Sequence, residues 1–254
     1  MPFVETSVAQ LWIADHRRDK SATVSIVIHG AGGSHLSFSK RLRQSIIVNS
    51  VCVDLGGHGK SQGNGRRSIG AYTNDVVALL NALAIDSAWI IGHSMGGAIA
   101  QCLALEHRDR ARGLVLIGTG PRLRVNPQLI NGVVNDRDAT IESLTRWMWS
   151  KNAGAELREQ SAKIMRQTKP SVIAGDFLAC DRFDVRERLD EIVCPTLIVA
   201  GENDKMTPVA LSQELAKRIP RSELVIVPGG SHMTMLEDSE MVVAAIEDWT
   251  ERNQ

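Results

Sequence analysis

The fold of this chain is decided by the stretch Trp89-Ile90-Ile91-Gly92-His93-Ser94-Met95-Gly96-Gly97-Ala98-Ile99-Ala100, an apolar run that stops at a glycine, turns and restarts with helix-forming residues. Residues 88–91 are apolar throughout, as in a buried parallel strand, and residues 97–105 are apolar and alanine-rich, as in a helix packed beneath it. A Gly-x-Ser-x-Gly at such a turn holds its serine in a strained backbone conformation, and its glycines remove side chains that would collide with neighbouring backbone. The pattern predicts that Ser94 is a nucleophile on a sharp turn.

Segments on both sides of this motif alternate between strand-like and helix-like patterns. β-Branched residues at 23–28 run into a glycine loop, and apolar residues recur at helical spacing from 69 to 83. In chain order we expect a hairpin within 3–14, a strand at 23–28, a helix at 36–43, a strand within 46–55, a helix at 69–83 and a strand at 113–118. This order predicts a parallel sheet with helices on both faces.

The alternation is interrupted between residues 121 and 187, where no strand-like run occurs. Helical spacing appears at 141–148 and 157–165, and a structureless loop of this length is improbable inside a compact domain, so a helical insertion is expected. The alternation then resumes with a strand at 195–201, a helix at 209–218, a strand at 223–227 and a closing helix at 239–251. The predicted fold class is α/β, with a doubly wound, mostly parallel sheet in a core of residues 1–120 and 188–254, and a helical lid at 121–187 inserted after the strand that follows the nucleophile helix.

Composition argues against several function classes. The 254 residues carry 29 basic and 29 acidic side chains, which gives no footprint for nucleic acid and no electrostatic membrane anchor. No basic segment followed by an apolar one opens the chain, and no run approaches 18 apolar residues, so a cytoplasmic location is expected. The four cysteines have neither metal-ligand nor redox-pair spacing and are expected to be buried or half-buried thiols. The oligomeric state stays open.

Two polar residues follow expected strands at their carboxyl ends, where an open α/β sheet binds its ligands. Asp204 and His232 each come shortly after such a strand. A serine is a weak nucleophile until a base takes its proton, and a histidine base needs a carboxylate to fix its tautomer. Ser94, Asp204 and His232 are therefore the candidate catalytic residues. The alternative is that Asp204 only caps the following helix, with Glu202 as the acid.

Four motifs together resemble the α/β-hydrolase family, in its lidded, serine carboxylesterase-like branch. They are His29-Gly30-Ala31-Gly32, residues 54–61, residues 92–97, and the loops of Asp204 and His232. The resemblance covers nearly the whole chain. It implies an oxyanion hole formed by the backbone N–H of Met95 and by one N–H after the His-Gly pair, that of Ala31 or, one residue later, of Gly32.

Further residues are candidates for the substrate pocket. The glycine loop contributes Gly30 and Gly32, Met233 follows the candidate base, and His35 is placed at the pocket mouth, whereas His29 and His58 are expected to brace loops. Trp147 and Trp149 are two residues apart and cannot share a helix face. We expect one of these tryptophans to pack in the lid and the other to face the substrate, without knowing which.

Departures from relatives narrow the activity that the resemblance implies. Haloalkane dehalogenases and epoxide hydrolases place Asp where this chain has Ser94. Carbon–carbon bond hydrolases typically show Asn where it has His93, and the menaquinone-pathway synthase carries Arg where it has Ala98.

The function expected is hydrolysis of small carboxylic esters through an acyl-enzyme, with no cofactor and no metal. The insertion carries eleven basic and nine acidic residues, so we expect a neutral substrate with a short-to-medium acyl group, bound by apolar contact. The alternatives on the same triad are a cofactor-free haloperoxidase or perhydrolase, a lactone or thioester hydrolase, and a carbon–carbon bond hydrolase. A ligand receptor with vestigial hydrolysis is the alternative from another class.

Overall fold

The sheet at the centre of the molecule has eight strands. A computed structural model describes residues 2–19, 22–45 and 47–254, and the strands follow the spatial order β1-β2-β4-β3-β5-β6-β7-β8. Their bounds are β1 Phe3–Glu5, β2 Gln10–Asp15, β3 Ser25–Ile28, β4 Ser50–Val53, β5 Ala88–His93, β6 Ala111–Ile117, β7 Thr196–Gly201 and β8 Ser222–Val227. The strands from β4 to β8 in this order run parallel, and the hairpin β1–β2 is antiparallel. The predicted α/β fold class is confirmed; the strand prediction within 46–55 also included Ile46, which lies outside the described residues.

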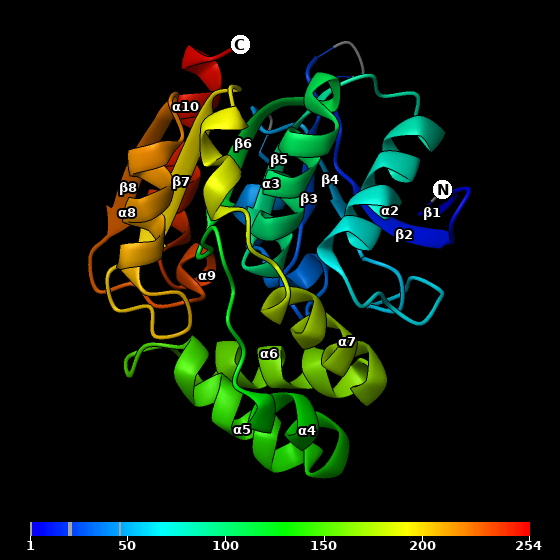
Figure 1. Ribbon diagram of the computed structural model, residues 1–254, viewed down its shortest axis with the longest axis vertical. Coiled ribbons are helices and arrows are strands. Elements are labelled where there is room, and N and C mark those ends of the chain that lie inside the picture. Colours follow the sequence, from blue (N-terminus) through cyan, green and yellow to red (C-terminus); the bar gives the residue numbers. More distant parts are fainter. Residues whose placement is uncertain (1, 20–21, 46) are drawn as a thin grey trace.

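Helices cover both faces of this sheet (Figure 1). On one face the core contains residues of α2 (Ile69–Ala82), α3 (Met95–Glu106) and α8 (Val209–Arg218). On the other face it contains residues of α1 (Lys40–Arg43), the short α9 (Thr234–Glu237) and α10 (Ser239–Arg252), where Trp249 packs edge-on against Trp89 of β5. Because β5 is buried on both faces, its sequence is apolar without alternation.

The helix expected at 36–43 is wrong as a single element. A short 3₁₀ turn, His35–Ser37, begins at Ser34, whose side chain caps it, and ends at the extended residue Phe38. Helix α1 then begins after a second capping serine, Ser39, whose side chain accepts a hydrogen bond from the N–H of Leu42. Two N-capping serines within six residues therefore start two short elements in place of the one helix expected.

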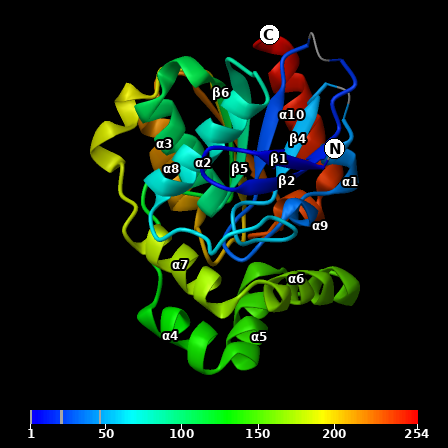
Figure 2. The same cartoon turned by 90° about the vertical axis from the view of Figure 1, so that its right-hand side faces the viewer.

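Residues between β6 and β7 form a separate group of helices. These are α4 (Pro127–Asn135), α5 (Arg137–Met148), α6 (Ala155–Gln167) and α7 (Pro170–Asp181). They gather at one end of the sheet, at the carboxyl ends of the strands (Figures 1 and 2), around a small apolar core of their own. The two ends of this insertion meet where Arg122 and Asp184 form an isolated β-bridge. Among the described residues no helix is both long and apolar enough to cross a membrane.

Candidate active site

Ser94 lies on a sharp turn between β5 and α3. Its backbone has φ 53° and ψ −114°, a conformation that costs a non-glycine residue about 1–3 kcal/mol and persists only where the surroundings enforce it. The neighbouring glycines show how tight the turn is: a Cβ at Gly92 would lie 2.2 Å from the carbonyl oxygen of Gly96, and a Cβ at Gly96 would lie 2.2 Å from that of Ile28. Any side chain at either position would force the strand and the helix apart.

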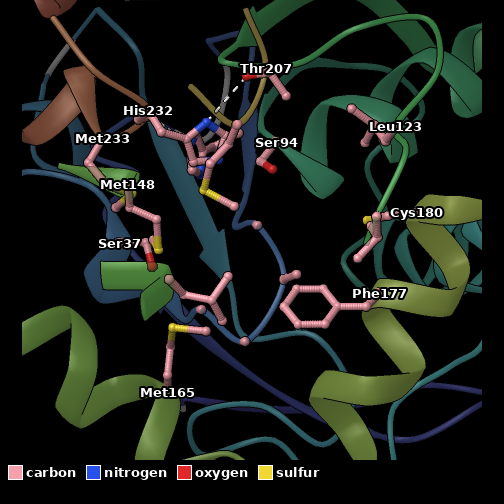
Figure 3. A pocket seen from close by; sticks show the side chains of 18 of the residues that line it. Ser37, Ser94, Leu123, Met148, Met165, Phe177, Cys180, Thr207, His232 and Met233 are labelled. Atoms are coloured by element: carbon pink, nitrogen blue, oxygen red, sulfur yellow. Dashed lines mark hydrogen bonds between the residues drawn. The ribbon is translucent and has the colours of Figure 1, made fainter. Parts of the chain in front are cut away.

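The Ser94 side chain is not used to cap the helix that it precedes. Serine at an N-cap normally accepts a hydrogen bond from the helix backbone, but Ser94 makes none. The residue is half-buried and lines a cavity at the carboxyl ends of the strands, where His232 also lies (Figure 3). The strained turn therefore directs the hydroxyl into the cavity and away from the helix.

His232 is bonded to a buried carboxylate. Its Nδ1 lies 2.8 Å from Oδ2 of Asp204 and 3.2 Å from the hydroxyl of Thr207 (Figure 3), and that hydroxyl donates to the same Oδ2 at 2.7 Å. The other oxygen, Oδ1, accepts the backbone N–H groups of Met206 and Thr207. Although burial opposes ionisation, the His232 ring and the bonds from Thr207 hold the pKa of Asp204 at about 2. An ionised carboxylate at Nδ1 fixes the tautomer in which Nε2 is the free base.

His93, the residue before Ser94, supports the loop that carries His232. His93 is buried, and its Nε2 donates to the carbonyl of His232 at 3.0 Å, with the two rings 4.7 Å apart. Burial and the neighbouring His232 ring lower the pKa of His93 to about 3, so it remains a neutral hydrogen-bond donor. His93 thus links the nucleophile turn to the histidine loop. In the described part of the chain, Ser94 Oγ and the His232 ring face the same cavity without a hydrogen bond between them; such contacts often tighten only when substrate binds.

The glycine loop after β3 passes beside Ser94. Gly33 donates its N–H to the carbonyl of Gly30 at 3.1 Å, which closes a β-turn with Ala31 and Gly32 at its centre. A Cβ on Gly30 would lie 3.1 Å from Cβ of Ser94. The N–H of Gly32 donates to Oδ2 of Asp176 at 2.9 Å and is therefore occupied. Of the two oxyanion donors that the sequence left open, only Ala31 keeps its N–H available in the described structure.

The cavity between these loops and the insertion is small and mostly apolar, at about 100 Å³. Gly30, Gly32 and Met233, three of the candidate pocket residues, line it. Its walls also include four methionines from four segments and apolar side chains of the insertion: Leu123, Val125, Leu144, Met148, Ile164, Met165, Phe177, Met206 and Met233 (Figure 3). Methionine is flexible and polarisable, which allows such a wall to adapt to different acyl groups.

Three residues expected in this cavity lie elsewhere. His35 is held away from the pocket mouth because its ring stacks on Trp12 and its Nδ1 lies 2.9 Å from Oδ1 of Asp54. Helix α5 ends at Met148, so Trp149 is extended and buried in the core under the sheet, whereas Trp147 is 45% exposed. The two tryptophans line a different surface cavity, and Met148 between them reaches the pocket.

Two residues of this region, Thr207 and Asp176, were not predicted from the sequence. Thr207, three residues after Asp204, bonds both partners of the histidine pair. Asp176 is a fully buried carboxylate in an otherwise apolar segment of α7, and a lone charge in such a segment is the signal that could have revealed it. Among the described residues no group of His, Cys, Asp and Glu is arranged to hold a metal ion.

Comparisons with known proteins find esterases and other hydrolases. The chain is 27% identical over 240 residues to the pimeloyl-[acyl-carrier protein] methyl ester esterase of Neisseria meningitidis, covering 89% of this chain and 92% of the relative. It is 25% identical over 247 residues to the 2-hydroxymuconate semialdehyde hydrolase of Pseudomonas putida, covering 89% and 86%. The solved structure of a thermophilic esterase superposes with a TM-score of 0.88 at 29% identity, over 99% of this chain and 97% of that one. The family model Hydrolase_4, described as serine aminopeptidase, S33, matches residues 20–239, so the chain belongs to this family of α/β-hydrolase enzymes.

Proposed function

We propose that this protein is a serine hydrolase that cleaves small, neutral carboxylic esters through an acyl-enzyme intermediate. One observation carries the proposal: the strained, uncapped Ser94 faces the same apolar cavity as His232, whose Nδ1 is bonded to the buried carboxylate of Asp204. Neither a serine in a turn nor a histidine pair would be distinctive alone. Together they supply a nucleophile, a base and the group that orients the base.

In the proposed reaction Ser94 Oγ attacks the ester carbonyl carbon while its proton passes to Nε2 of His232. The tetrahedral intermediate then expels the alcohol, which takes that proton from His232, and the acyl group remains on Ser94. Water repeats the sequence and releases the acid. Asp204 keeps Nδ1 protonated and stabilises the imidazolium, and its low pKa keeps it charged throughout the working pH range.

The backbone N–H groups of Met95 and Ala31 are the donors that stabilise the developing oxyanion in this proposal. Met95 is the first residue of α3, so its N–H and the positive end of the helix dipole point toward the nucleophile turn. Ala31 lies at the glycine turn that touches Ser94. The occupied N–H of Gly32 supports Ala31 as the second donor.

The cavity size favours a short acyl group. An engineered apolar cavity of roughly 150 Å³ is large enough for benzene. At about 100 Å³, the cavity beside Ser94 suits acyl groups of acetyl to butyryl size, with adaptable methionine walls allowing longer chains at lower efficiency. We further propose that the insertion of residues 121–187 acts as a lid, because its helices supply much of the cavity wall.

Carbon–carbon bond hydrolysis is the second candidate, since one relative is named a semialdehyde hydrolase. The apolar wall offers little to bind the charged groups of such substrates: Arg124 is the one ionisable side chain, apart from His93, His232 and Cys180, among the described residues that line the cavity. Lactones, thioesters and peracid formation remain compatible with the same triad. A receptor role would require a single acylation event without turnover.

The test is a panel of p-nitrophenyl esters of increasing acyl length, run beside a lactone, a thioester, an amide and a vinylogous diketone. We expect turnover of the esters with a maximum at two to four carbons (about the size that the cavity admits). The Ser94→Ala variant should fold normally and lose at least about 10³-fold in kcat/KM. Wild-type-like ester hydrolysis by Ser94→Ala would refute the proposal, and faster cleavage of the diketone than of any ester would favour the second candidate.

A further inference from the structure

A buried carboxylate of the insertion reaches the catalytic machinery of the core. Asp176, on α7, is fully buried and makes contacts to three different segments. Its Oδ2 accepts the N–H of Gly32 at 2.9 Å and lies 2.8 Å from Nε2 of His58, and its Oδ1 accepts the hydroxyl of Tyr72. Gly32 belongs to the glycine turn beside Ser94, whereas His58 and Tyr72 belong to the loop after β4 and to α2. No step of the proposed reaction uses this carboxylate directly.

The contacts of the His58 ring favour its protonated form. Its two nitrogens both face acceptors: Nε2 faces Asp176, and Nδ1 lies 3.2 Å from the carbonyl oxygen of Gly56. A ring nitrogen must be protonated to donate to either, so the ring that satisfies both is imidazolium. Burial alone would favour the neutral ring, but the facing carboxylate outweighs it and raises the pKa of His58. A buried ion pair therefore joins the insertion to the loop after β4.

The Asp176 carboxylate also determines how the glycine turn is oriented. Gly32 has φ +63°, the left-handed value that the third position of a type II turn requires. Types I and II differ mainly in the orientation of the central peptide, here the one between Ala31 and Gly32. An acceptor that bonds the Gly32 N–H from outside the cavity holds this peptide in one orientation. It thereby restrains the whole turn, including the neighbouring N–H of Ala31.

We propose that Asp176 is a positioning residue that preorganises the oxyanion hole and makes its assembly depend on the docked insertion. The proposal rests on the ester hydrolase function proposed above. The carboxylate sits on α7, so the turn receives its acceptor only when α7 is packed against the core. The contacts with His58 and Tyr72 hold that carboxylate in place. Displacing α7 would release the Gly32 N–H and leave the oxyanion donors mobile.

The expected effect falls on the transition state and not on substrate binding. Deleting one oxyanion donor elsewhere lowers kcat by roughly 10²-fold to 10³-fold. Loosening a donor should cost less, so Asp176→Asn, which keeps the shape and removes the charge, should lower kcat for p-nitrophenyl acetate by about tenfold to a hundredfold. The KM should change by less than about threefold, because the apolar wall that holds the acyl group is retained.

A pair of ketone inhibitors separates positioning from a merely structural role. Ser94 Oγ attacks the carbonyl carbon of a trifluoromethyl ketone with a short alkyl chain and forms a tetrahedral oxyanion. The matching methyl ketone occupies the cavity without forming this covalent adduct. In Asp176→Asn the affinity for the first should fall in parallel with kcat, and the affinity for the second should stay within about threefold. Asp181→Asn is the matched control, because Asp181 ends the same helix but accepts the N–H of Val125, within the insertion. It should leave kcat and both affinities near wild type.

Each outcome of this experiment decides something. A folded Asp176→Asn with wild-type kcat, or one that raises KM alone, would overturn the positioning role while leaving the proposed function intact. Absence of ester turnover in wild type, or full activity in Ser94→Ala, would overturn both. If Asp176→Asn does not fold, His58→Gln takes its place, since glutamine can donate to Asp176 without the charge. That variant should lower kcat and trifluoromethyl ketone affinity together by about tenfold, and no change in either would overturn the proposal.

Discussion

Two buried aspartate–histidine pairs contact or belong to segments that line the cavity, and they differ in what the second ring nitrogen of the histidine bonds. Asp204 and His232 on the core meet at 2.8 Å, and so do Asp176 of the insertion and His58 of the core. In the second pair the remaining nitrogen of His58 is bonded to the carbonyl of Gly56. In the first pair, no protein group within the described structure bonds Nε2 of His232, and the ring borders the cavity with Ser94.

Distance and burial are nearly the same in both pairs and therefore do not identify a catalytic pair. A ring whose two nitrogens both face acceptors is held as a cation and serves as a fixed tether. A ring with one nitrogen on a carboxylate and the other on a cavity can take up and return a proton. We therefore assign chemistry to His232 and positioning to His58, and the predictions below test that division.

The largest difference is expected between the two acidic residues of the Asp204 loop. Asp204→Asn should lower kcat by roughly 10²-fold to 10⁴-fold, because an amide favours the wrong tautomer of His232 and cannot stabilise its cation. Steady-state kinetics on p-nitrophenyl acetate measures this. Glu202→Gln is the matched control: the exposed Glu202 side chain accepts the backbone N–H of Gly229, its one hydrogen bond among the described residues, and the variant should remain near wild type. A damaging Glu202→Gln with a benign Asp204→Asn would reverse the assignment.

The Asp204 pair should also show itself in the acid stability of the fold. The pKa of Asp204 is about 2 in the folded chain against a usual 3.8, so its stabilisation is complete above about pH 4 and is lost as the pH falls toward 2. Over that window wild type should lose about 2 kcal/mol more free energy of unfolding than Asp204→Asn. Urea unfolding at several pH values measures the difference. Parallel pH dependences for the two proteins would mean that the carboxylate is not held ionised by His232.

A smaller effect is expected where the insertion lines the cavity. Phe177 projects from α7 into the cavity opposite His232 (Figure 3), so Phe177→Leu should lengthen the space for the acyl chain. The ratio of kcat/KM for hexanoate over acetate should rise by about tenfold, or roughly 1.4 kcal/mol. Trp147→Ala serves as the control, since this exposed side chain lies outside the cavity. A shift in chain-length preference in Trp147→Ala but not in Phe177→Leu would contradict the cavity assignment.

The smallest effect should come from Thr207, whose hydroxyl contributes one of the hydrogen bonds that Asp204 receives. Thr207→Val keeps the shape of the side chain and removes the donor, so kcat should fall by about threefold to tenfold. The same kinetic assay measures it, with Ser212→Ala as a buried control on α8 that contacts neither Asp204 nor His232. A loss as large as that of Asp204→Asn would mean that Thr207 does more than orient the carboxylate.

Much of the fold and the main candidate residues could be predicted from the chain because local signals and topology agree. The strand before Ser94 is apolar at residues 88–91, and Gly92 and Gly96 stand where a Cβ would collide with backbone oxygens. Asp204 and His232 follow β7 and β8, which are neighbouring parallel strands. Parallel neighbours have their carboxyl ends at the same edge of the sheet, so the two residues are brought close together. Such placement requires no knowledge of side-chain packing.

What could not be predicted depends on contacts between segments distant in the chain. Asp176 and His58 are 118 residues apart, and no local pattern pairs them. His35 was expected at the pocket mouth, but its ring packs against Trp12 and its Nδ1 bonds Asp54, so it does not line the cavity. The expectation for the two tryptophans treated both as helical, but α5 ends at Met148, where the helical spacing at 141–148 also ends, and Trp149 is extended.

The most direct test of the account is to locate the covalent intermediate. Wild type and Asp176→Asn would each be treated with a fluorophosphonate and with p-nitrophenyl acetate quenched in acid, then digested and analysed by mass spectrometry. We predict one adduct per chain, on Ser94, in both proteins, forming more slowly in Asp176→Asn. An adduct on any other residue, or ester turnover without acylation of Ser94, would contradict it.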